Sequence, residues 1–145
     1  MEIIDLINFG SSQLKKNNIN SYMLDSEILL SKVLNKKREE LLTNSNQIVE
    51  IQKIDYFQKL IERRSLKEPI AYILKEKEFW SKNFLVDENT LIPRPETELI
   101  VEKITQVFKE KKIFILDIGT GTGCILLSIL SELKNSNGIG IDISK

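Results

Sequence analysis

The 145-residue sequence contains no histidine, and its cysteine content is limited to Cys124. Without histidine the chain cannot build a Ser-His-Asp catalytic triad or a histidine-ligated metal site. A lone cysteine excludes a disulfide within the chain and fits a reducing compartment. The formal net charge is zero, so no excess of cations is present to attract nucleic acid or an anionic membrane. We therefore expect no metal centre, no membrane partner and no direct nucleic-acid partner.

Long hydrophobic runs are also missing from the sequence. The apolar stretches fall far short of the ~20 residues that a membrane-spanning helix requires. Residues 1–5 place acidic side chains where a secretory signal peptide needs basic ones. The sequence therefore predicts a cytoplasmic protein, with the ordinary apolar and charged content of a globular chain.

The first part of the chain, up to about Leu66, has apolar residues spaced by three and four positions, as in amphipathic helices. The stripes are Ile3, Ile4, Ile7 and Leu14; Leu24, Ile28, Leu29, Val33 and Leu34; and Ile51, Ile54, Phe57, Leu60 and Ile61. Three or four short helices with one apolar face each indicate a small bundle over residues 1–68. The basic pairs Lys36-Lys37 and Arg63-Arg64 are expected on solvated helix faces.

Residues 69–95 are predicted to form a β-hairpin linker. Proline disfavours helical geometry in the residue before it, so Pro69 marks a boundary. The apolar residues 70–74 are interpreted as an extended run, which a charged turn separates from a second run within residues 79–86. Pro95 is expected near the start of a helix that continues to about Lys111.

From residue 113 onward the pattern changes. Residues 113–118 form a continuous apolar run, typical of a parallel strand covered on both faces. Three glycines follow, then helical spacing over residues 124–133 and a second strand at 138–143. The order strand, glycine loop, helix, strand opens a Rossmann-like sheet. We therefore predict an α/β fold class, with residues 96–145 as the start of a Rossmann-like domain.

The glycine loop is the strongest candidate site. Gly119 and Gly121 let the backbone approach a ligand without a Cβ in the way, whereas Gly123 can serve helix packing alone. The helix after the loop begins with unpaired N–H groups. Asp142 follows Gly123 by 19 residues, near the ~20-residue offset at which an acid meets the ribose hydroxyls of a nucleotide-like cofactor. The candidate cofactor-binding residues are Asp117, Gly119, Thr120, Gly121, Thr122, Gly123 and Asp142.

Asp117, Thr120 and Thr122 each have two possible roles that the sequence does not distinguish. Asp117 either accepts hydrogen bonds from loop N–H groups or contacts the cofactor's amino group. Thr120 and Thr122 either donate hydrogen bonds to the cofactor or are ordinary polar loop residues.

The glycine spacing decides between cofactors. A dinucleotide fingerprint is G-x-G-x-x-G, but here the third glycine comes one residue early and Cys124 occupies its place. This spacing disfavours a nicotinamide-dependent dehydrogenase. The run from Asp117 to Gly123 resembles the first motif of S-adenosylmethionine-dependent methyltransferases, whose cofactor has no pyrophosphate.

A second segment narrows the resemblance. Residues 91–98, Leu-Ile-Pro-Arg-Pro-Glu-Thr-Glu, follow Glu-Pro-Ile-Ala-Tyr at 68–72 and Glu-Phe-Trp-Ser at 78–81. Together with the glycine loop, these stretches resemble the HemK/PrmC family, which methylates a glutamine side-chain nitrogen in bacterial peptide chain release factors. The resemblance covers the whole chain. One departure is Lys75, where the family usually has glycine.

The resemblance implies roles for further residues. It implies S-adenosylmethionine as cofactor, release factors as partners of a monomeric protein, and a helical N-terminal domain that recognises them. The linker residues Arg94, Glu96 and Glu98 are implied substrate contacts at the mouth of the active site. For Arg94, an ion pair that ties the linker to the sheet is an equal alternative.

The family's Asn-Pro-Pro-Tyr motif, which holds the substrate amide, does not occur in these 145 residues. We therefore assign no catalytic residue and expect the chain alone, read as a truncated methyltransferase, to be inactive. A non-catalytic fragment that binds release factors is one alternative function. A methyltransferase acting on amino groups of nucleic acid is another, which the neutral net charge disfavours.

Overall fold

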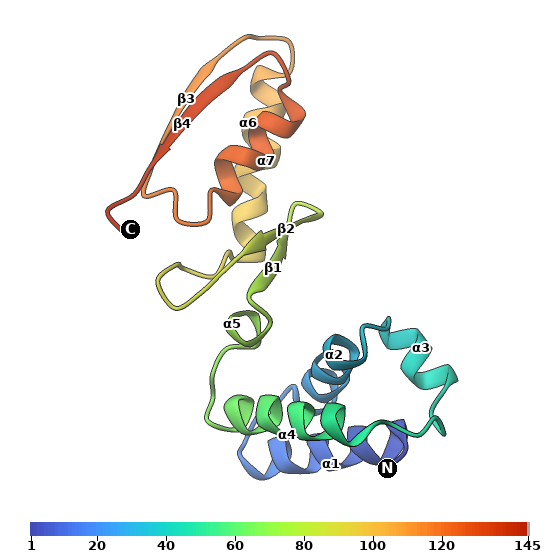
Figure 1. Ribbon diagram of the computed structural model, residues 1–145. Coiled ribbons are helices and arrows are strands. Elements are labelled where there is room, and N and C mark those ends of the chain that lie inside the picture. Colours follow the sequence, from blue (N-terminus) through green and yellow to red (C-terminus); the bar gives the residue numbers. More distant parts are fainter. Residues whose placement is uncertain (145) are drawn as a thin grey trace. The chain divides into compact units, whose positions relative to one another are not determined.

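The computed structural model describes residues 1–144, and these divide into one compact unit formed by Met1–Leu74 and another that begins at Lys75 (Figure 1). The mixture of helices and paired strands confirms the predicted α/β fold class. The structure divides the chain after Leu74, which lies between the boundaries predicted after residues 68 and 95. Lys145, the last residue of the predicted 96–145 domain, lies outside the described residues.

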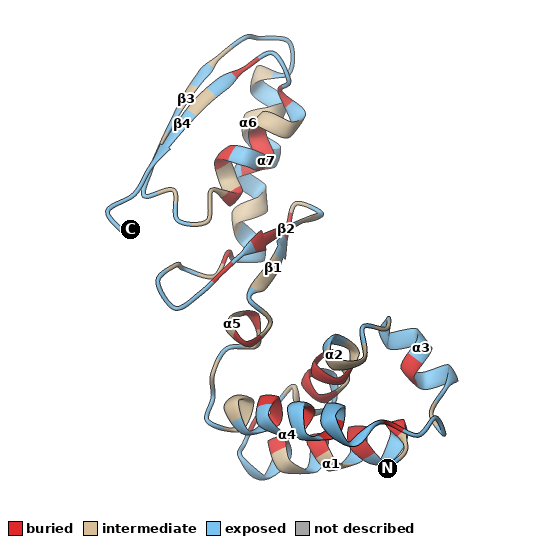
Figure 2. Cartoon of the chain, in the orientation of Figure 1, coloured by how far each residue is buried: buried red, intermediate tan, exposed pale blue. Residues whose placement is uncertain are grey.

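The first unit is helical. Its elements are α1 (Ile3–Lys16), α2 (Tyr22–Leu34), α3 (Arg38–Thr43), α4 (Ile51–Ser65) and α5 (Ile70–Leu74). The apolar stripes form the shared core, in which Leu14, Leu29 and Phe57 are fully buried (Figure 2). Three stripe positions were wrong, because Ile4, Leu24 and Ile51 are 37%, 42% and 69% exposed.

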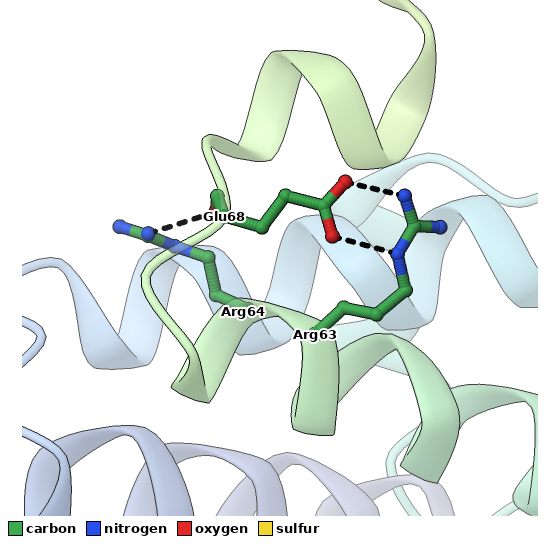
Figure 3. A network of polar contacts seen from close by, with 3 residues as sticks. All are labelled: Arg63, Arg64 and Glu68. Atoms are coloured by element: carbon green, nitrogen blue, oxygen red, sulfur yellow. Dashed lines mark hydrogen bonds and ion pairs between the residues drawn. The ribbon is translucent and has the colours of Figure 1, made fainter. Parts of the chain in front are cut away.

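An ion-pair network connects α4 with α2 and with the turn before α5. Arg63 donates from Nε and Nη2 to the two carboxylate oxygens of Glu68 at 2.8 and 2.5 Å (Figure 3). Arg64 donates to the Asp25 carboxylate at 2.7 Å and to the Glu68 carbonyl at 3.0 Å. The Arg64 side chain is only 16% exposed. The prediction that Arg63-Arg64 is a solvated helix face was therefore wrong for Arg64.

The predicted extended run at residues 70–74 was also wrong, because Ile70–Leu74 forms the short helix α5. Pro69 precedes this helix, and the fixed backbone of proline suits the first turn of a helix. The Pro69 carbonyl accepts N–H bonds from Tyr72 and Ile73 at 3.0 and 3.2 Å. Ala71 and Ile73 are buried.

The hairpin itself begins later than predicted. Strand β1 (Glu76–Phe79) pairs with β2 (Lys82–Leu85) in antiparallel register. Trp80 and Ser81 form the tight turn between them with φ values of 50° and 54°, which matches the twist of a two-residue hairpin. Phe79 packs edge-to-face on Phe84, with ring centroids 6.2 Å apart.

The remaining elements follow the predicted order. They are the 3₁₀ turn η1 (Pro95–Thr97), α6 (Glu98–Phe108), β3 (Phe114–Ile118), α7 (Cys124–Glu132) and β4 (Asn137–Ile141). Strands β3 and β4 pair in parallel, which confirms the strand–loop–helix–strand prediction. Within residues 1–144, no helix is both long and apolar enough to cross a membrane.

Strand β3 is less buried than the sequence predicted. Ile115 packs into a core with Val101 of α6 and Ile129 of α7, whereas Phe114 and Ile118 are 67% and 74% exposed. The strand is therefore not covered on both faces in the described residues. Alternate side chains of a strand point to opposite faces, and both helices pack on the face that carries Ile115.

Candidate functional site

The glycine loop joins β3 to α7 and is fastened to the end of β4. Gly119, Gly121 and Gly123 have φ values of 77°, 52° and 75°, in the left-handed region where glycine alone is unstrained. The N–H groups of Gly119 and Thr120 both donate to the carbonyl of Ile141, at 2.8 and 3.0 Å. These bonds fix the loop at the carboxyl ends of the parallel strands, where open α/β sheets bind their ligands.

The loop is open on the side where glycine lacks a side chain. A Cβ built on Gly119 or Gly121 would meet no atom within 4 Å, whereas one on Gly123 would lie 3.3 Å from Leu127 Cδ1. Gly119 and Gly121 thus leave free space for a ligand at the backbone. Gly123 contacts helix α7, in agreement with a packing role.

Asp142 follows β4 and faces the same loop. Its Oδ2 accepts the Gly121 N–H at 2.7 Å, and its Oδ1 accepts the Ser144 N–H at 2.9 Å. Hydrogen bonds from the backbone N–H groups of Ser144 and Gly121 lower the pKa of the Asp142 carboxyl below its usual value. The side chain is therefore an ionised acceptor at neutral pH. A carboxylate has about four lone-pair sites, so sites remain for a ligand's hydroxyl groups.

Asp117 and Thr120 contact each other. The Thr120 hydroxyl donates to Asp117 Oδ2 at 2.7 Å, so this carboxylate supports the loop from within. Thr122 is half-buried in the loop. A residue that the sequence reasoning missed is Gly140 of β4, where a Cβ would lie 2.7 Å from Thr120 Oγ1. Its signal was available, because Gly140 lies in a strand, where glycine often marks close approach of another segment.

A cavity of about 390 Å³ lies in front of the loop. Its lining residues are Asp87, Asn89, Thr90, Leu91, Gly119, Gly121, Asp142 and Ser144. The structure thus brings the glycine loop and Asp142 together. It adds Asp87, Asn89 and Thr90, which follow β2 and belong to neither the glycine motif nor the linker motif.

The implied substrate residues lie apart from this cavity. Arg94 and Glu96 are exposed, and neither is among the residues that line the cavity. Glu98 accepts the Trp80 N–H at 2.8 Å, which ties the hairpin turn to the start of α6. Of the implied substrate residues, Glu98 is therefore the one whose carboxylate has a structural contact in the described part of the chain.

The cavity fits the cofactor that the family resemblance implies. Gly119 and Gly121 leave open space beside the loop backbone, and Asp142 supplies a charged acceptor suited to ribose hydroxyls. Among the described residues, the lining includes two carboxylates, Asp87 and Asp142, and neither lysine nor arginine. This part of the lining suits a ligand with positive charge.

Comparison with known proteins gives a consistent result. The family model described as the PrmC N-terminal domain matches residues 5–74. A release factor glutamine methyltransferase of Buchnera aphidicola subsp. Acyrthosiphon pisum is 44% identical over 131 residues, which cover 90% of the chain and 47% of that protein. The corresponding protein of Aliivibrio fischeri is 46% identical over 122 residues, covering 84% of the chain and 43% of that protein.

A bifunctional methyltransferase of Rickettsia prowazekii is also similar. It is 38% identical over 161 residues, which cover 98% of the chain and 31% of that protein. The chain thus spans about half the length, or less, of these curated relatives. By its N-terminal domain and by these similarities, the chain belongs to the HemK/PrmC family.

Proposed function

We propose that the protein to which these residues belong transfers a methyl group from S-adenosylmethionine to a glutamine side-chain nitrogen of peptide chain release factors. Two relatives named as release factor glutamine methyltransferases support the reaction and the substrate class. The observation that carries the proposal is the open glycine cradle opposite the ionised Asp142. Release factors act in the cytoplasm, which is where we expect this activity.

The charge of the cavity supports the choice of cofactor. S-adenosylmethionine carries a sulfonium and an ammonium group against one carboxylate, so its net charge is positive. When bound, it supplies a methyl group activated by the positive sulfur. The negative charges of Asp87 and Asp142 favour such a cation.

The chain's own residues would hold the cofactor in two ways. Gly119 and Gly121 admit it against the backbone, and Asp142 accepts hydrogen bonds from ribose hydroxyls. Thr120 and Asp117 stabilise the loop, because the Thr120 hydroxyl donates a hydrogen bond to the Asp117 carboxylate. We assign Thr122 and Gly123 to the edge of the same site, where Gly123 starts helix α7.

The helical unit is proposed to recognise the release factor. Residues 5–74 match the PrmC N-terminal domain and nearly coincide with the compact unit Met1–Leu74. Arg94 and Glu96 remain proposed substrate contacts, since both are exposed and neither takes part in an ion pair among the described residues. For Glu98 we propose that its contact with Trp80 holds the hairpin in place next to the substrate.

An amide nitrogen is a poor nucleophile, because its lone pair is delocalised into the carbonyl. Transfer therefore requires groups that orient the amide and stabilise the charge that develops on it. The Asn-Pro-Pro-Tyr segment that would do so is absent from these 145 residues. We accordingly expect these residues by themselves to bind the cofactor and a release factor without transferring methyl groups.

A second candidate function is non-catalytic binding of release factors by the helical unit. It is favoured by the match to the PrmC N-terminal domain, which is confined to residues 5–74. One experiment separates the two. The 145-residue chain is mixed with methyl-labelled S-adenosylmethionine and a bacterial release factor, and ligand binding, complex formation and label transfer are measured.

We expect the chain to bind both the labelled cofactor and the release factor, with no label on the release factor. Binding of the release factor without the cofactor would support the second candidate function. Failure to bind the release factor would contradict the proposed substrate class. Label on the release factor would contradict the expected requirement for the missing segment.

A further inference from the structure

We propose that Asp87 makes the cavity prefer the positively charged S-adenosylmethionine over its demethylated product, S-adenosylhomocysteine. The inference rests on the proposed function and extends it to a residue that neither the glycine motif nor the linker motif includes. Asp87 immediately follows Val86, a buried residue at the end of the hairpin. It lines the same cavity as Gly119, Gly121 and Asp142.

One backbone N–H group holds the Asp87 carboxylate, and two further hydrogen bonds hold the backbone of Asp87 in the same turn. The Asn89 N–H donates to Asp87 Oδ1 at 3.0 Å, which forms an Asx turn. The Thr90 N–H donates to the Asp87 carbonyl at 3.1 Å, and the Asp87 N–H donates to Thr90 Oγ1 at 3.1 Å. The negative charge therefore has a defined place on the wall of the cavity.

The cofactor and its product differ by a methyl group and by the charge of the sulfur. Loss of the methyl group converts a sulfonium cation into a neutral thioether, while the ribose and the amino acid portion stay the same. The hydrogen bonds proposed between Asp142 and the ribose hydroxyls are the same for the two molecules. A second carboxylate on the cavity wall distinguishes them, because its attraction acts on the sulfonium charge.

The proposed preference has a consequence for turnover. When the methyl group leaves, the attraction between Asp87 and the sulfur disappears. The product is then held less tightly than the cofactor that replaces it. Because Asp87 is exposed, water screens the interaction and the expected preference is a few-fold.

The substitution Asp87→Asn tests the proposal. Asparagine forms the same Asx turn, so the loop keeps its geometry while the charge is lost. We expect the affinity for S-adenosylmethionine to fall about two- to fivefold, and the affinity for S-adenosylhomocysteine to stay unchanged. Isothermal titration of the 145-residue chain with each ligand measures both constants.

Glu88→Gln is the matched control. It removes one negative charge from the next residue, which is exposed and is not among those that line the cavity. It should leave the ratio of the two dissociation constants unchanged. In about 1 M salt, where the screening length is about 3 Å, the difference between Asp87→Asn and the unaltered chain should shrink.

Three results would overturn the proposal: equal weakening of both ligands by Asp87→Asn, no effect on either, or the same change in ratio from Glu88→Gln. Circular dichroism would identify a loss of folding as the cause of equal weakening. In that case Asp87→Glu, which keeps the charge, should bind S-adenosylmethionine more tightly relative to S-adenosylhomocysteine than a folded variant without the charge does. If the unaltered chain binds neither ligand, the proposed function itself fails. If it binds both and only the predicted ratio change is missing, the role of Asp87 alone fails.

Discussion

At the scale of single residues, Asp25 shows how the fold accommodates a charge that is nearly removed from water. Its side chain is 5% exposed, and one carboxylate oxygen accepts bonds from Arg64 Nε at 2.7 Å and from the Ser21 hydroxyl at 2.8 Å. A buried pair with all its partners is tolerated, but removal of one partner leaves the other charge without compensation.

We predict that Asp25→Ala lowers the free energy of unfolding by about 3 kcal/mol, because Arg64 would keep a buried charge without its carboxylate. Urea denaturation followed by helical circular dichroism measures the change. Asp55→Ala, on the exposed side of α4, is the control and should change stability by less than about 0.5 kcal/mol. Equal effects of the two substitutions would show that the buried pair has no special role.

At the scale of elements, the junction between α5 and β1 depends on the backbone of Lys75. This residue has a φ of 59°, in the left-handed region where a side chain is strained. Its carbonyl also accepts the Val86 N–H at 3.3 Å, so the conformation is held from the far end of the hairpin. The family that the chain resembles usually has glycine at this position. The left-handed backbone gives the physical reason, because glycine adopts it without strain.

The substitution Lys75→Gly should therefore raise the free energy of unfolding, by about 0.5 kcal/mol once the greater chain entropy of glycine is counted. Lys77→Gly, inside β1, has no positive φ to relieve and should lower it by about 0.5–1 kcal/mol. Thermal denaturation of both variants measures whether the free energy of unfolding rises or falls in each. A stability loss in Lys75→Gly would contradict the proposed strain.

The turn between α4 and α5 makes the helical unit sensitive to acid. The hydrogen bonds from Arg63 lower the pKa of Glu68 below its usual value (Figure 3). A carboxyl group with a lowered folded-state pKa contributes stability above its unfolded pKa of about 4.3. That contribution is lost as the pH falls through the folded-state pKa.

We expect Glu68→Gln to lower the free energy of unfolding by about 0.5 kcal/mol at pH 7. The effect is small because both partners are partly exposed and water screens the pair. The cost should shrink as the pH falls below about 4 and the carboxylate of the unaltered protein is protonated. Urea denaturation at several pH values measures it, with the exposed Glu62→Gln as control. A cost that is independent of pH would mean that the ion pair is not its source.

Periodic features could be predicted from the sequence, and contacts between distant residues could not. Leu29 and Phe57 lie in regular apolar stripes, so their burial could be predicted. The order β3–α7–β4 could also be predicted, because the spacing of apolar residues changes between strand and helix. Residues 70–74 form a short apolar run, whose period does not distinguish helix from strand. Asp25 and Arg64 are 39 residues apart and share no local pattern, so only the fold reveals the pair.

At the scale of the whole molecule, a net charge of zero conceals an uneven distribution. Asp87 and Asp142 line the cavity at the glycine loop. In the same unit, another cavity of about 530 Å³ is lined by Lys109, Glu110, Lys111, Lys112, Glu132, Leu133, Lys134 and Asn135. Composition alone therefore gives no guide to the charge that a ligand meets, and the sign at each cavity follows from the fold.

The proposed reaction depends on binding of S-adenosylmethionine by the glycine loop and Asp142. Isothermal titration of the 145-residue chain with S-adenosylmethionine and with a nicotinamide dinucleotide, repeated with Asp142→Asn, measures this binding. We expect the chain to bind S-adenosylmethionine alone, and the variant to bind it about tenfold or more weakly, as expected for a hydrogen bond to a charged group. Tighter binding of the dinucleotide, or an affinity for S-adenosylmethionine unchanged in Asp142→Asn, would show that the loop and Asp142 do not form an S-adenosylmethionine site.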